Sequence, residues 1–206
     1  MNVVLLGPPG AGKGTLAVQL AQSLGLLHLS TGDLLRDEVA RGTPLGRQAE
    51  GYMKRGELVP DEVVLAMVKE RVNGVRGVLL DGFPRTLAQA RGLEAFLKVD
   101  KVVYLAISKE EVVRRLSSRR VCTRCGAVFN LVTQPPQQAD RCDRCQGPLA
   151  VRPDDRPEVV ARRYEVYERD SAPLVDYYRR QGLLVEVNAA QSPEAVGAQA
   201  RAALSQ

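Results

Sequence analysis

The chain has 206 residues, of which 45% are hydrophobic and 26% are charged, so it is long enough for one domain with a sizeable core and lacks the composition of a disordered protein. Its formal charge of +5 suits a phosphate-rich partner, but the arginines mostly recur singly after predicted turns, which favours a small-molecule site over a nucleic-acid surface. No apolar run approaches the ~20 residues of a membrane-spanning helix and no secretion signal is evident, so we expect a cytoplasmic protein.

Short strands of branched or leucine-rich residues alternate with longer helices whose apolar residues recur every three or four positions. Strands are predicted at residues 2–6, 27–29, 77–81, 101–106 and 183–188. Helices are predicted at 14–24, 32–41, 45–55, 61–72, 86–97, 109–118, 157–181 and 193–204. Because helices of this length connect parallel strands, the pattern predicts an α/β fold with a central parallel five-stranded sheet and helices on both faces.

Two segments depart from this alternation. Residues 30–60 contain two short helical pieces separated by glycines, with no strong strand between them, and predict a helical flap beside the sheet. Residues 120–155 contain all the cysteines, several prolines and hydrophilic turns, and predict a small β-rich insert.

The stretch GPPGAGKGT, residues 7–15, directly follows the first strand and opens the first helix. Its glycines let backbone N–H groups converge on phosphate oxygens at a helix N-terminus, and Lys13 supplies a charge for β- and γ-phosphates. Gly14 occupies the hydroxyl position of the GxxxxGK[ST] pattern and Thr15 follows it, so a loop hydroxyl is not in its usual place for magnesium. The strand and helix on either side disfavour the alternative, an ordinary glycine-rich turn.

Two further polar stretches end predicted strands, STGDLLR at 30–36 and LLDGFPRT at 79–86. Ligands of open α/β sheets bind at the carboxyl ends of strands, so both are candidate site segments. Asp81 is placed to hold water on a magnesium ion, and Pro84 presents Arg85 rigidly. Taken alone, Ser30 could equally cap a helix and Asp81 could end a strand in a simple turn.

Five stretches together resemble, in order and spacing, the adenylate kinases: GPPGAGKGT, STGDLLR, GELVPDE, LDGFPRT and RPDDRPEVVARR. The resemblance covers essentially the full chain and extends to the long form, whose ATP lid is a β-rich insert that binds zinc through cysteines in one subgroup. It implies a P-loop nucleoside monophosphate kinase fold with a core of residues 1–29, 60–118 and 156–206, an AMP-binding flap at 30–59 and a zinc-bearing ATP lid at 119–155. It also implies a monomer that reversibly transfers a phosphoryl group from Mg-ATP to AMP, giving two ADP, in adenine nucleotide homeostasis.

The resemblance assigns site residues position by position. ATP binding is implied for Gly10, Ala11, Gly12, Lys13, Gly14, Thr15, Arg115, Arg119, Val128, Phe129 and Gln191. AMP binding is implied for Thr31, Arg36, Glu57, Leu58, Val59, Gly82, Phe83, Pro84, Arg85, Gln89, Arg152 and Arg163. The residues expected to act on the phosphates are Lys13, Asp81, Arg85, Arg119, Arg152 and Arg163. Phe129 departs from the family, where a tyrosine is frequent, and Gln191 replaces a variable residue.

These assignments also have a physical reason. Phosphoryl transfer leaves the protein little covalent work, so the rate depends on alignment and on charge placed around the migrating group, which guanidinium groups supply well. Asp154 and Asp155 are expected to orient the arginines, the alternative being a solvated pair at a helix start. The amide of Gln89 offers a donor and an acceptor to an adenine edge.

The four cysteines form two CxxC pairs, Cys122 with Cys125 and Cys142 with Cys145, separated by sixteen residues. In a reducing compartment this spacing indicates a metal site rather than disulfides, and four thiolates leave no open position, so we expect a structural Zn²⁺. Iron in the same cage, and metal-free cysteines, remain alternatives. The only histidine, His28, is expected to fill a strand end rather than to bind metal.

Two other functions are alternatives to the adenylate kinase interpretation. A nucleic-acid-binding protein could use a zinc ribbon and the basic region at 114–124, but this leaves DGFPRT, Arg152 and Arg163 without a role. A closer alternative is a kinase for another nucleoside monophosphate or one that uses GTP as donor. Gln89 and the long lid argue mildly against the first of these.

Overall fold

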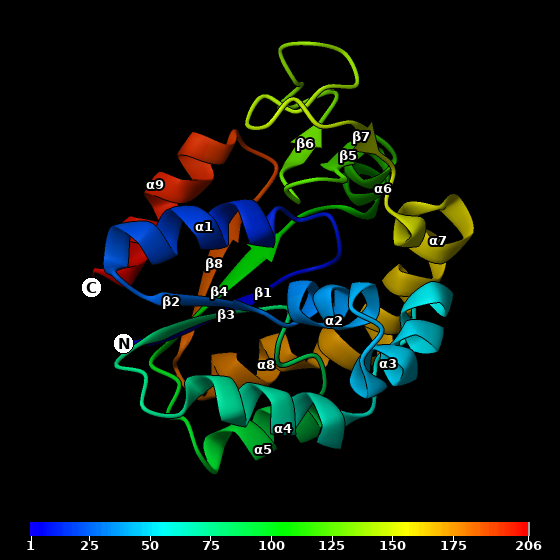
Figure 1. Cartoon of the computed structure of the whole chain (residues 1–206). Coiled ribbons are helices and arrows are strands. Elements are labelled where there is room, and N and C mark those ends of the chain that lie inside the picture. The colour runs from blue at the N-terminus through cyan, green and yellow to red at the C-terminus, as the bar shows by residue number, and fades with distance from the viewer. Residues whose placement is uncertain (206) are drawn as a thin grey trace.

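The computed structural model describes residues 1–205 and contains a parallel five-stranded sheet with helices on both faces, beside a separate three-stranded sheet (Figure 1). This confirms the predicted fold class. None of the helices in the described residues combines the length and the apolar character needed to cross a lipid bilayer. In chain order the elements are β1 (Asn2–Leu6), α1 (Lys13–Leu24), β2 (Leu27–Ser30), α2 (Thr31–Ala40), α3 (Pro44–Arg55), α4 (Asp61–Val72), β3 (Val78–Asp81), α5 (Leu87–Glu94), β4 (Lys101–Ala106), α6 (Lys109–Ser117), β5 (Arg119–Cys122), β6 (Val128–Asn130), β7 (Leu149–Ala150), the 3-10 turn η1 (Pro153–Asp155), α7 (Pro157–Val166), the π turn η2 (Tyr167–Ser171), α8 (Pro173–Arg180), β8 (Leu184–Asn188) and α9 (Pro193–Leu204).

The strands of the large sheet follow the order β2-β3-β1-β4-β8, and every neighbouring pair is parallel. Asp81 at the end of β3 lies between Leu5 of β1 and Ser30 of β2 in register. Parallel strands end at the same edge of a sheet, so the segments that follow β1, β2 and β3 emerge side by side there. These are the three segments in which the sequence predicts the site.

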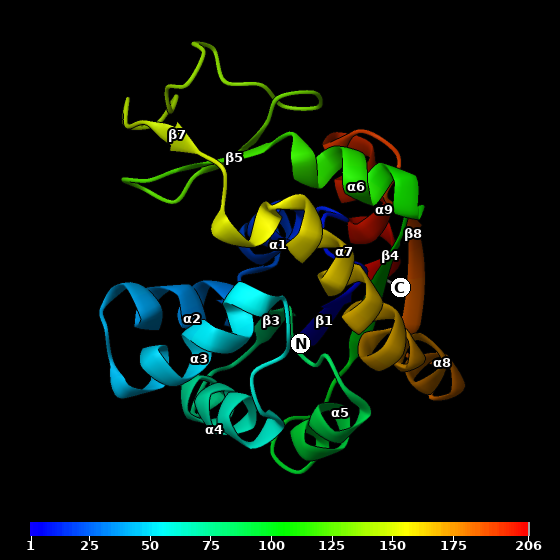
Figure 2. The same ribbon diagram turned by 90° about the vertical axis from the view of Figure 1, so that its right-hand side faces the viewer.

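Helices cover both faces of the large sheet, which explains why its central strands β1 and β3 are almost wholly buried and rich in apolar residues. In β1, Val3 and Leu5 pack toward α1 and α9, whereas Val4 and Leu6 pack toward α4, α5 and α8. All four side chains are buried, as the two-residue period of a strand between helical layers requires. Figure 2 shows α4, α5 and α8 grouped on their side of the sheet.

The helical flap consists of α2 and α3, which pack closely against each other with no strand between them, as predicted. The Thr43 hydroxyl caps α3 by accepting from the N–H of Gly46 (3.0 Å), and it donates to a carboxylate oxygen of Glu38 in α2 (2.5 Å). A Cβ at Gly46 would lie 2.0 Å from the Glu38 carbonyl oxygen, so only glycine permits this approach of the two backbones.

The predicted β-rich insert is a three-stranded antiparallel sheet in which β5 is flanked by β6 and β7. It stands off the main body at the top of Figure 1, and long turns connect its short strands. We call residues 119–155 the lid segment.

The prediction of one continuous helix at 157–181 is wrong, because the helix is interrupted in its middle. The chain forms α7, then the π turn η2, then α8. Pro173 has no N–H and its ring disrupts the regular ladder of the preceding turn. The N–H of Ala172 accordingly donates to the carbonyl of Tyr167 (2.8 Å), five residues back, as in a π turn.

Substitution of Gly46 tests the flap packing. Gly46→Ala should lower the free energy of unfolding by about 3 kcal/mol, at the upper end for overpacking, because the new methyl meets backbone atoms of α2. In the same helix, a Cβ at Gly51 would meet only the flexible end of Arg55 (3.3 Å), so Gly51→Ala should stabilise by roughly 0.5–1 kcal/mol. Urea unfolding of both variants measures the difference, and equal effects would show that α2 and α3 separate freely.

Candidate active site and metal centre

The glycine-rich loop joins β1 to α1 at the carboxyl edge of the sheet. Gly10 and Gly12 have φ angles of 84° and 95°, a conformation that other residues rarely adopt. A Cβ at Gly10 would also lie 2.9 Å from Cγ of Leu116 in α6. The loop therefore needs glycine for its shape and for its packing, and α1 begins at Lys13 as the phosphate-loop interpretation requires.

Lys13 folds its ammonium group back onto the loop. Its Nζ donates to the carbonyl oxygens of Gly7 (2.7 Å) and Pro8 (2.8 Å). Burial lowers the pKa of Lys13 to about 7, the Asp81 carboxylate opposes this shift, and nearby arginines add to it. The ammonium thus sits where an added negative charge is strongly favoured, which is the electrostatic signature of an anion site.

A cleft opens between the flap and the sheet edge, and its open space is about 620 Å³ with the solvent at its mouth included. The predicted AMP residues that line it are Thr31, Arg36, Glu57, Leu58, Val59, Gly82, Arg85, Gln89 and Arg163. Phe83 and Pro84 are buried instead, Phe83 within the hydrophobic core. Arg152 does not line this cleft, but it lies close enough to Arg36 for their charges to interact.

Two arginines from different segments share one buried carboxylate. Arg119, at the start of the lid segment, makes a bidentate pair with Asp155, and Nη1 of Arg163 in α7 lies 3.1 Å from Oδ1 of the same residue. Nη1 of Arg163 also lies 3.1 Å from a carboxylate oxygen of Asp154. The Asp155 side chain is fully buried, so removing either guanidinium would leave a buried group without one of its partners. Both aspartates contact Arg163, and their orienting role stays a prediction.

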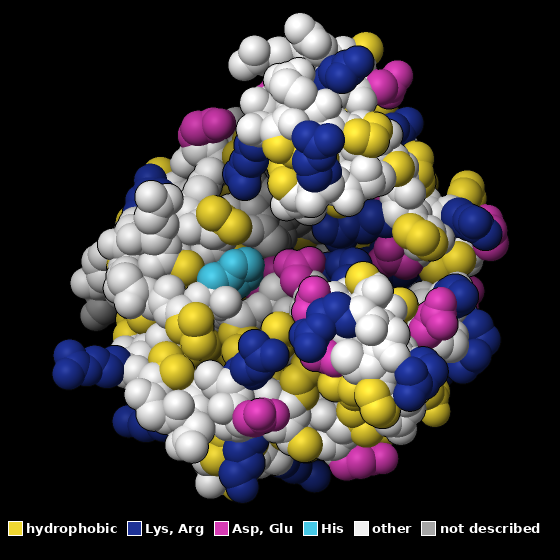
Figure 3. Space-filling view, viewed as in Figure 1, with side chains coloured by type: hydrophobic (Ala, Val, Ile, Leu, Met, Phe, Trp, Pro, Cys, Tyr) yellow, Lys and Arg dark blue, Asp and Glu magenta, His cyan; other side chains and the backbone are white. Residues whose placement is uncertain are grey.

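Arg85 and Arg152 have few charged partners of their own. Burial lowers the pKa of each to about 10. The positive charge of Arg163 lowers the pKa of Arg85 further, and the positive charge of Arg36 has the same effect on Arg152. The Arg85 Nε donates to the Gly82 carbonyl (2.7 Å), and its own carbonyl accepts from the Ser171 hydroxyl (2.8 Å) of the π turn. Figure 3 shows basic and acidic side chains gathered around the hollow below the lid segment.

Asp81 lies at the end of β3 and is buried. One carboxylate oxygen would be 3.5 Å from a Cβ at Gly14, so the carboxylate borders the start of α1. The same oxygen lies 3.6 Å from Nε2 of His28, and this nitrogen has no hydrogen-bond partner within the described residues. His28 therefore approaches the site, which the sequence-based expectation of a strand-end filler missed.

Two further polar residues lie near the site, and the sequence patterns indicated one of them, Ser30, but not the other, Asp33. Ser30 caps α2 by accepting from the N–H of Asp33 (3.2 Å), as the simpler alternative held. Asp33 itself was not predicted, yet it pairs with Arg36 at the cleft. Burial works against its ionised form, but the Arg36 guanidinium holds the pKa of Asp33 below its ordinary value.

The predicted ATP residues outside the glycine-rich loop occupy two places. Arg115 donates to the carbonyl of Ala189 (2.8 Å), which brings α6 to the loop that contains Gln191. Val128 and Phe129 lie in β6 of the lid segment, where Val128 is exposed and Phe129 is buried with the cysteines. Ala11 is also buried, in the core under α1.

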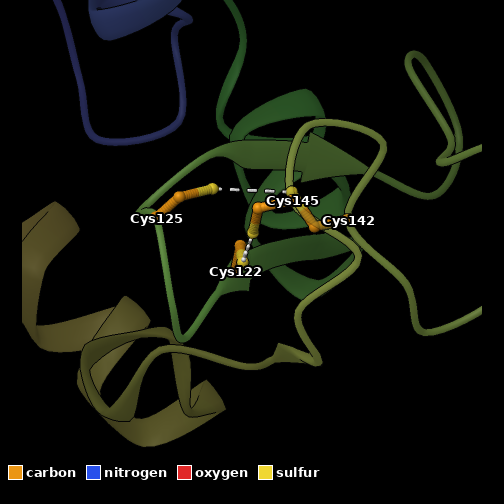
Figure 4. A group of neighbouring side chains, drawn as sticks. All are labelled: Cys122, Cys125, Cys142 and Cys145. Carbon is orange, nitrogen blue, oxygen red and sulfur yellow. Dashed lines mark hydrogen bonds between the residues drawn. The ribbon is translucent and has the colours of Figure 1, made fainter.

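The four cysteines converge, although they come from two separate turns of the lid segment (Figure 4). Their sulfur atoms all lie within 4.8 Å of one another, and the Cys122–Cys145 and Cys125–Cys142 pairs are each 3.5 Å apart. These distances are far longer than the ~2.05 Å of a disulfide and close to the roughly 3.8 Å expected across a tetrahedral site with metal–sulfur bonds of ~2.3 Å.

Comparison with known proteins identifies the family. Residues 5–183 match the model described as adenylate kinase. The chain belongs to the adenylate kinase family. The adenylate kinase of Archaeoglobus fulgidus is 48% identical over 204 residues, 95% of this chain and 94% of its own length. Those of Moorella thermoacetica and of a Geobacillus species are 47% and 46% identical over 95% and 98% of this chain and 94% and 97% of theirs.

Substitution of Asp155 tests the carboxylate that Arg119 and Arg163 share. Asp155→Ala should lower the free energy of unfolding by about 3–5 kcal/mol, because Arg119 and Arg163 both lose a buried partner. Asp176 pairs with Arg179 at the surface, where both side chains are more than half exposed, so Asp176→Ala should cost under about 1 kcal/mol. Chemical denaturation compares the two, and similar small losses would show that Asp155 contributes little.

Proposed function

We propose that the chain catalyses reversible transfer of the γ-phosphoryl group of Mg-ATP to AMP, giving two ADP. The observation that carries the proposal is the convergence of Lys13 with Arg85, Arg119 and Arg163, whose charges all lower the pKa of Lys13. Positive groups from the glycine-rich loop, the DGFPRT segment, the lid segment and α7 thus surround one space beside the cleft. A polyphosphate is the ligand class that such a cluster suits best.

In this reaction an oxygen of the AMP phosphate bonds to the γ-phosphorus of ATP as the bond from that phosphorus to the bridging oxygen of ADP breaks. The AMP phosphate is already anionic near pH 7, so no side-chain base is required. The protein contributes alignment of the two nucleotides and positive charge around the transferring group. Burial of the cluster strengthens both effects by excluding water.

Each part of the cluster receives a role. We assign the backbone N–H groups of residues 10–15 and Lys13 to the ATP phosphates, together with Arg119. Arg85 and Arg36, which line the cleft, are assigned to the AMP phosphate, with Arg152 nearby. Arg163 lines the cleft, and its charge acts on the pKa of both Lys13 and Arg85, so it is assigned to the transferring phosphoryl.

In this proposal, the adenine of AMP and the base of ATP lie in two separate parts of the site. The adenine of AMP is assigned to Gln89, Thr31 and the main chain of 57–59, which line the cleft. The base of ATP is assigned to the exposed face of β6 that carries Val128 and to the junction of Arg115 with the Gln191 loop. Phe129 supports this face from its buried position rather than through a polar contact.

Asp81 fits a magnesium ion brought in by ATP. Its buried carboxylate borders the start of α1 next to Lys13, with no stronger partner than a histidine at 3.6 Å in the described chain. When bound, Mg²⁺ would neutralise charge on the β- and γ-phosphates. Asp81 would orient its water ligands from the end of β3.

Two mobile units on one core follow from the same assignment. We propose that residues 119–155 act as the ATP lid and 30–59 as the AMP flap on a core formed by 1–29, 60–118 and 156–206. Closure of the lid would exclude water, which would otherwise hydrolyse ATP. A monomer in the cytoplasm suits this role in adenine nucleotide balance.

A coupled assay of ADP formation tests the function. With ATP as donor, AMP should be phosphorylated with a higher kcat/KM than CMP, UMP or GMP, because Gln89 is placed for an adenine edge. Arg85→Ala should reduce kcat/KM by at least ~100-fold, as expected when a charge that contacts the transferring phosphates is removed. Equal use of the four monophosphates would contradict the assignment.

Zn²⁺ is the metal we propose for the lid segment. Four cysteine sulfur atoms within 4.8 Å of one another suit the tetrahedral coordination of zinc, and they would leave no coordination position for a substrate. Backbone groups support the site, since the N–H of Arg124 donates to Sγ of Cys122 (3.4 Å). The metal would therefore stabilise the fold of the lid segment and take no part in the transfer.

Metal content and one cysteine variant test this role. Protein prepared without chelators should hold one equivalent of zinc. Cys142→Ser should lower Tm by roughly 6–12 °C, the shift that about 3 kcal/mol produces in a chain of this size, with kcat at moderate temperature little changed. Val132→Ser places the same side chain at an exposed site of the lid segment and should leave Tm within ~2 °C. A folded Cys142→Ser protein without activity would contradict a purely structural metal.

A further inference from the structure

The amide of Gln89 is held in one orientation. Gln89 is only 2% exposed, lies in the first turn of α5 and lines the cleft. Its Nε2 donates to Oδ1 of Asp61 (2.7 Å), and its Oε1 accepts from the backbone N–H of Arg85 (2.7 Å). Both partners are themselves fixed, one at the start of α4 and the other in the DGFPRT segment.

The chemistry of these partners decides which way the amide points. An ionised carboxylate only accepts hydrogen bonds and a backbone N–H only donates. If the amide were turned by 180°, its oxygen would face Asp61 and its nitrogen would face the N–H of Arg85. Both bonds would then be replaced by repulsive contacts, which is costly for a buried group.

Asp61 is held in place by its surroundings. Its Oδ2 accepts from the Thr86 hydroxyl (2.8 Å), and the same hydroxyl caps α5 by accepting from the N–H of Gln89 (3.0 Å). The helices α4 and α5 also approach closely, because a Cβ at Gly92 would lie 2.8 Å from Leu65. Asp61 stands in the first turn of α4, so the helix fixes the position of its backbone.

We infer that Asp61 determines the base specificity of the cleft by fixing the Gln89 amide, an inference that rests on the proposed binding of AMP there. After its two protein bonds, the amide retains one hydrogen on Nε2 and one lone pair on Oε1. A 6-aminopurine offers a donor at N6 and an acceptor at N1, whereas a 6-oxopurine offers an acceptor at O6 and a donor at N1–H. The fixed amide matches the first pattern, and only the reversed amide would match the second.

Asp61→Asn tests this inference with little change in volume. The asparagine can turn its own NH₂ toward Gln89, so the reversed amide regains this partner and keeps only one unfavourable contact, with the N–H of Arg85. The ratio of kcat/KM for AMP to kcat/KM for IMP should fall by about tenfold, the effect of a changed hydrogen bond in a buried site. The change should appear mainly as a lower KM for IMP, because the original orientation that suits AMP keeps both of its bonds, and kcat for AMP should be altered less.

Three further variants separate amide orientation from general damage. Glu62→Gln makes the same charge change at an exposed neighbouring position of α4 and should leave the ratio unchanged. Asp61→Glu keeps an acceptor-only group and should hold the ratio within about threefold even where both KM values rise. If thermal unfolding shows that Asp61→Asn is not folded, Asp61→Ser, which can donate and accept, is read in the same way.

The outcomes distinguish the inference from the proposed function. A folded Asp61→Asn protein whose KM values for AMP and IMP rise equally, with the ratio unchanged, overturns the role of Asp61 and leaves AMP phosphorylation intact. A wild-type protein that does not prefer AMP to IMP overturns the assignment of the cleft to AMP itself. A ratio that falls in Asp61→Asn and is retained in Asp61→Glu supports both.

Discussion

The crowding of positive charge around one cleft is the constraint on which the rest of this structure depends. Burial and mutual repulsion lower the pKa of Lys13 to about 7 and those of Arg85 and Arg152 to about 10. Carboxylates behind the guanidinium groups, above all Asp155, hold the arginines in position despite this repulsion. A bound polyphosphate would relieve the remaining repulsion, and this relief would make its binding more favourable.

The parallel sheet makes this crowding possible, because it brings three loops to one edge while both of its faces stay buried. The remaining charges come from outside the sheet, namely Arg36 from the flap, Arg163 from α7, and Arg119 and Arg152 from the lid segment. The cluster is thus divided among the core, the flap and the lid segment. In the proposed reaction, phosphates would draw these segments together, and the same charges would bind the substrate and close the site.

Local patterns in the sequence predicted the strands, the glycine-rich loop and the two CxxC turns, because each depends on residues near one another in the chain. Contacts that depend on strand order were not accessible in this way. His28 meets Asp81 because β2 lies beside β3 in register, and Phe129 faces the cysteines because of its register with β5. The π turn before Pro173 depends on a backbone hydrogen bond to the residue five positions back, and the spacing of apolar residues in the sequence does not predict which carbonyl a backbone N–H will bond.

The lid segment shows why a metal and a charge cluster belong together. Its buried core comprises Cys122, Ala127, Phe129 and Cys142, too few apolar residues to hold a sheet of such short strands. The segment nevertheless carries Arg119 where β5 begins and Arg152 just after β7, and β5 pairs with β7, so both arginines lie at one end of the same small sheet. Cross-linking by four thiolates would fix this spacing, which allows both charges to reach the phosphates as one rigid unit.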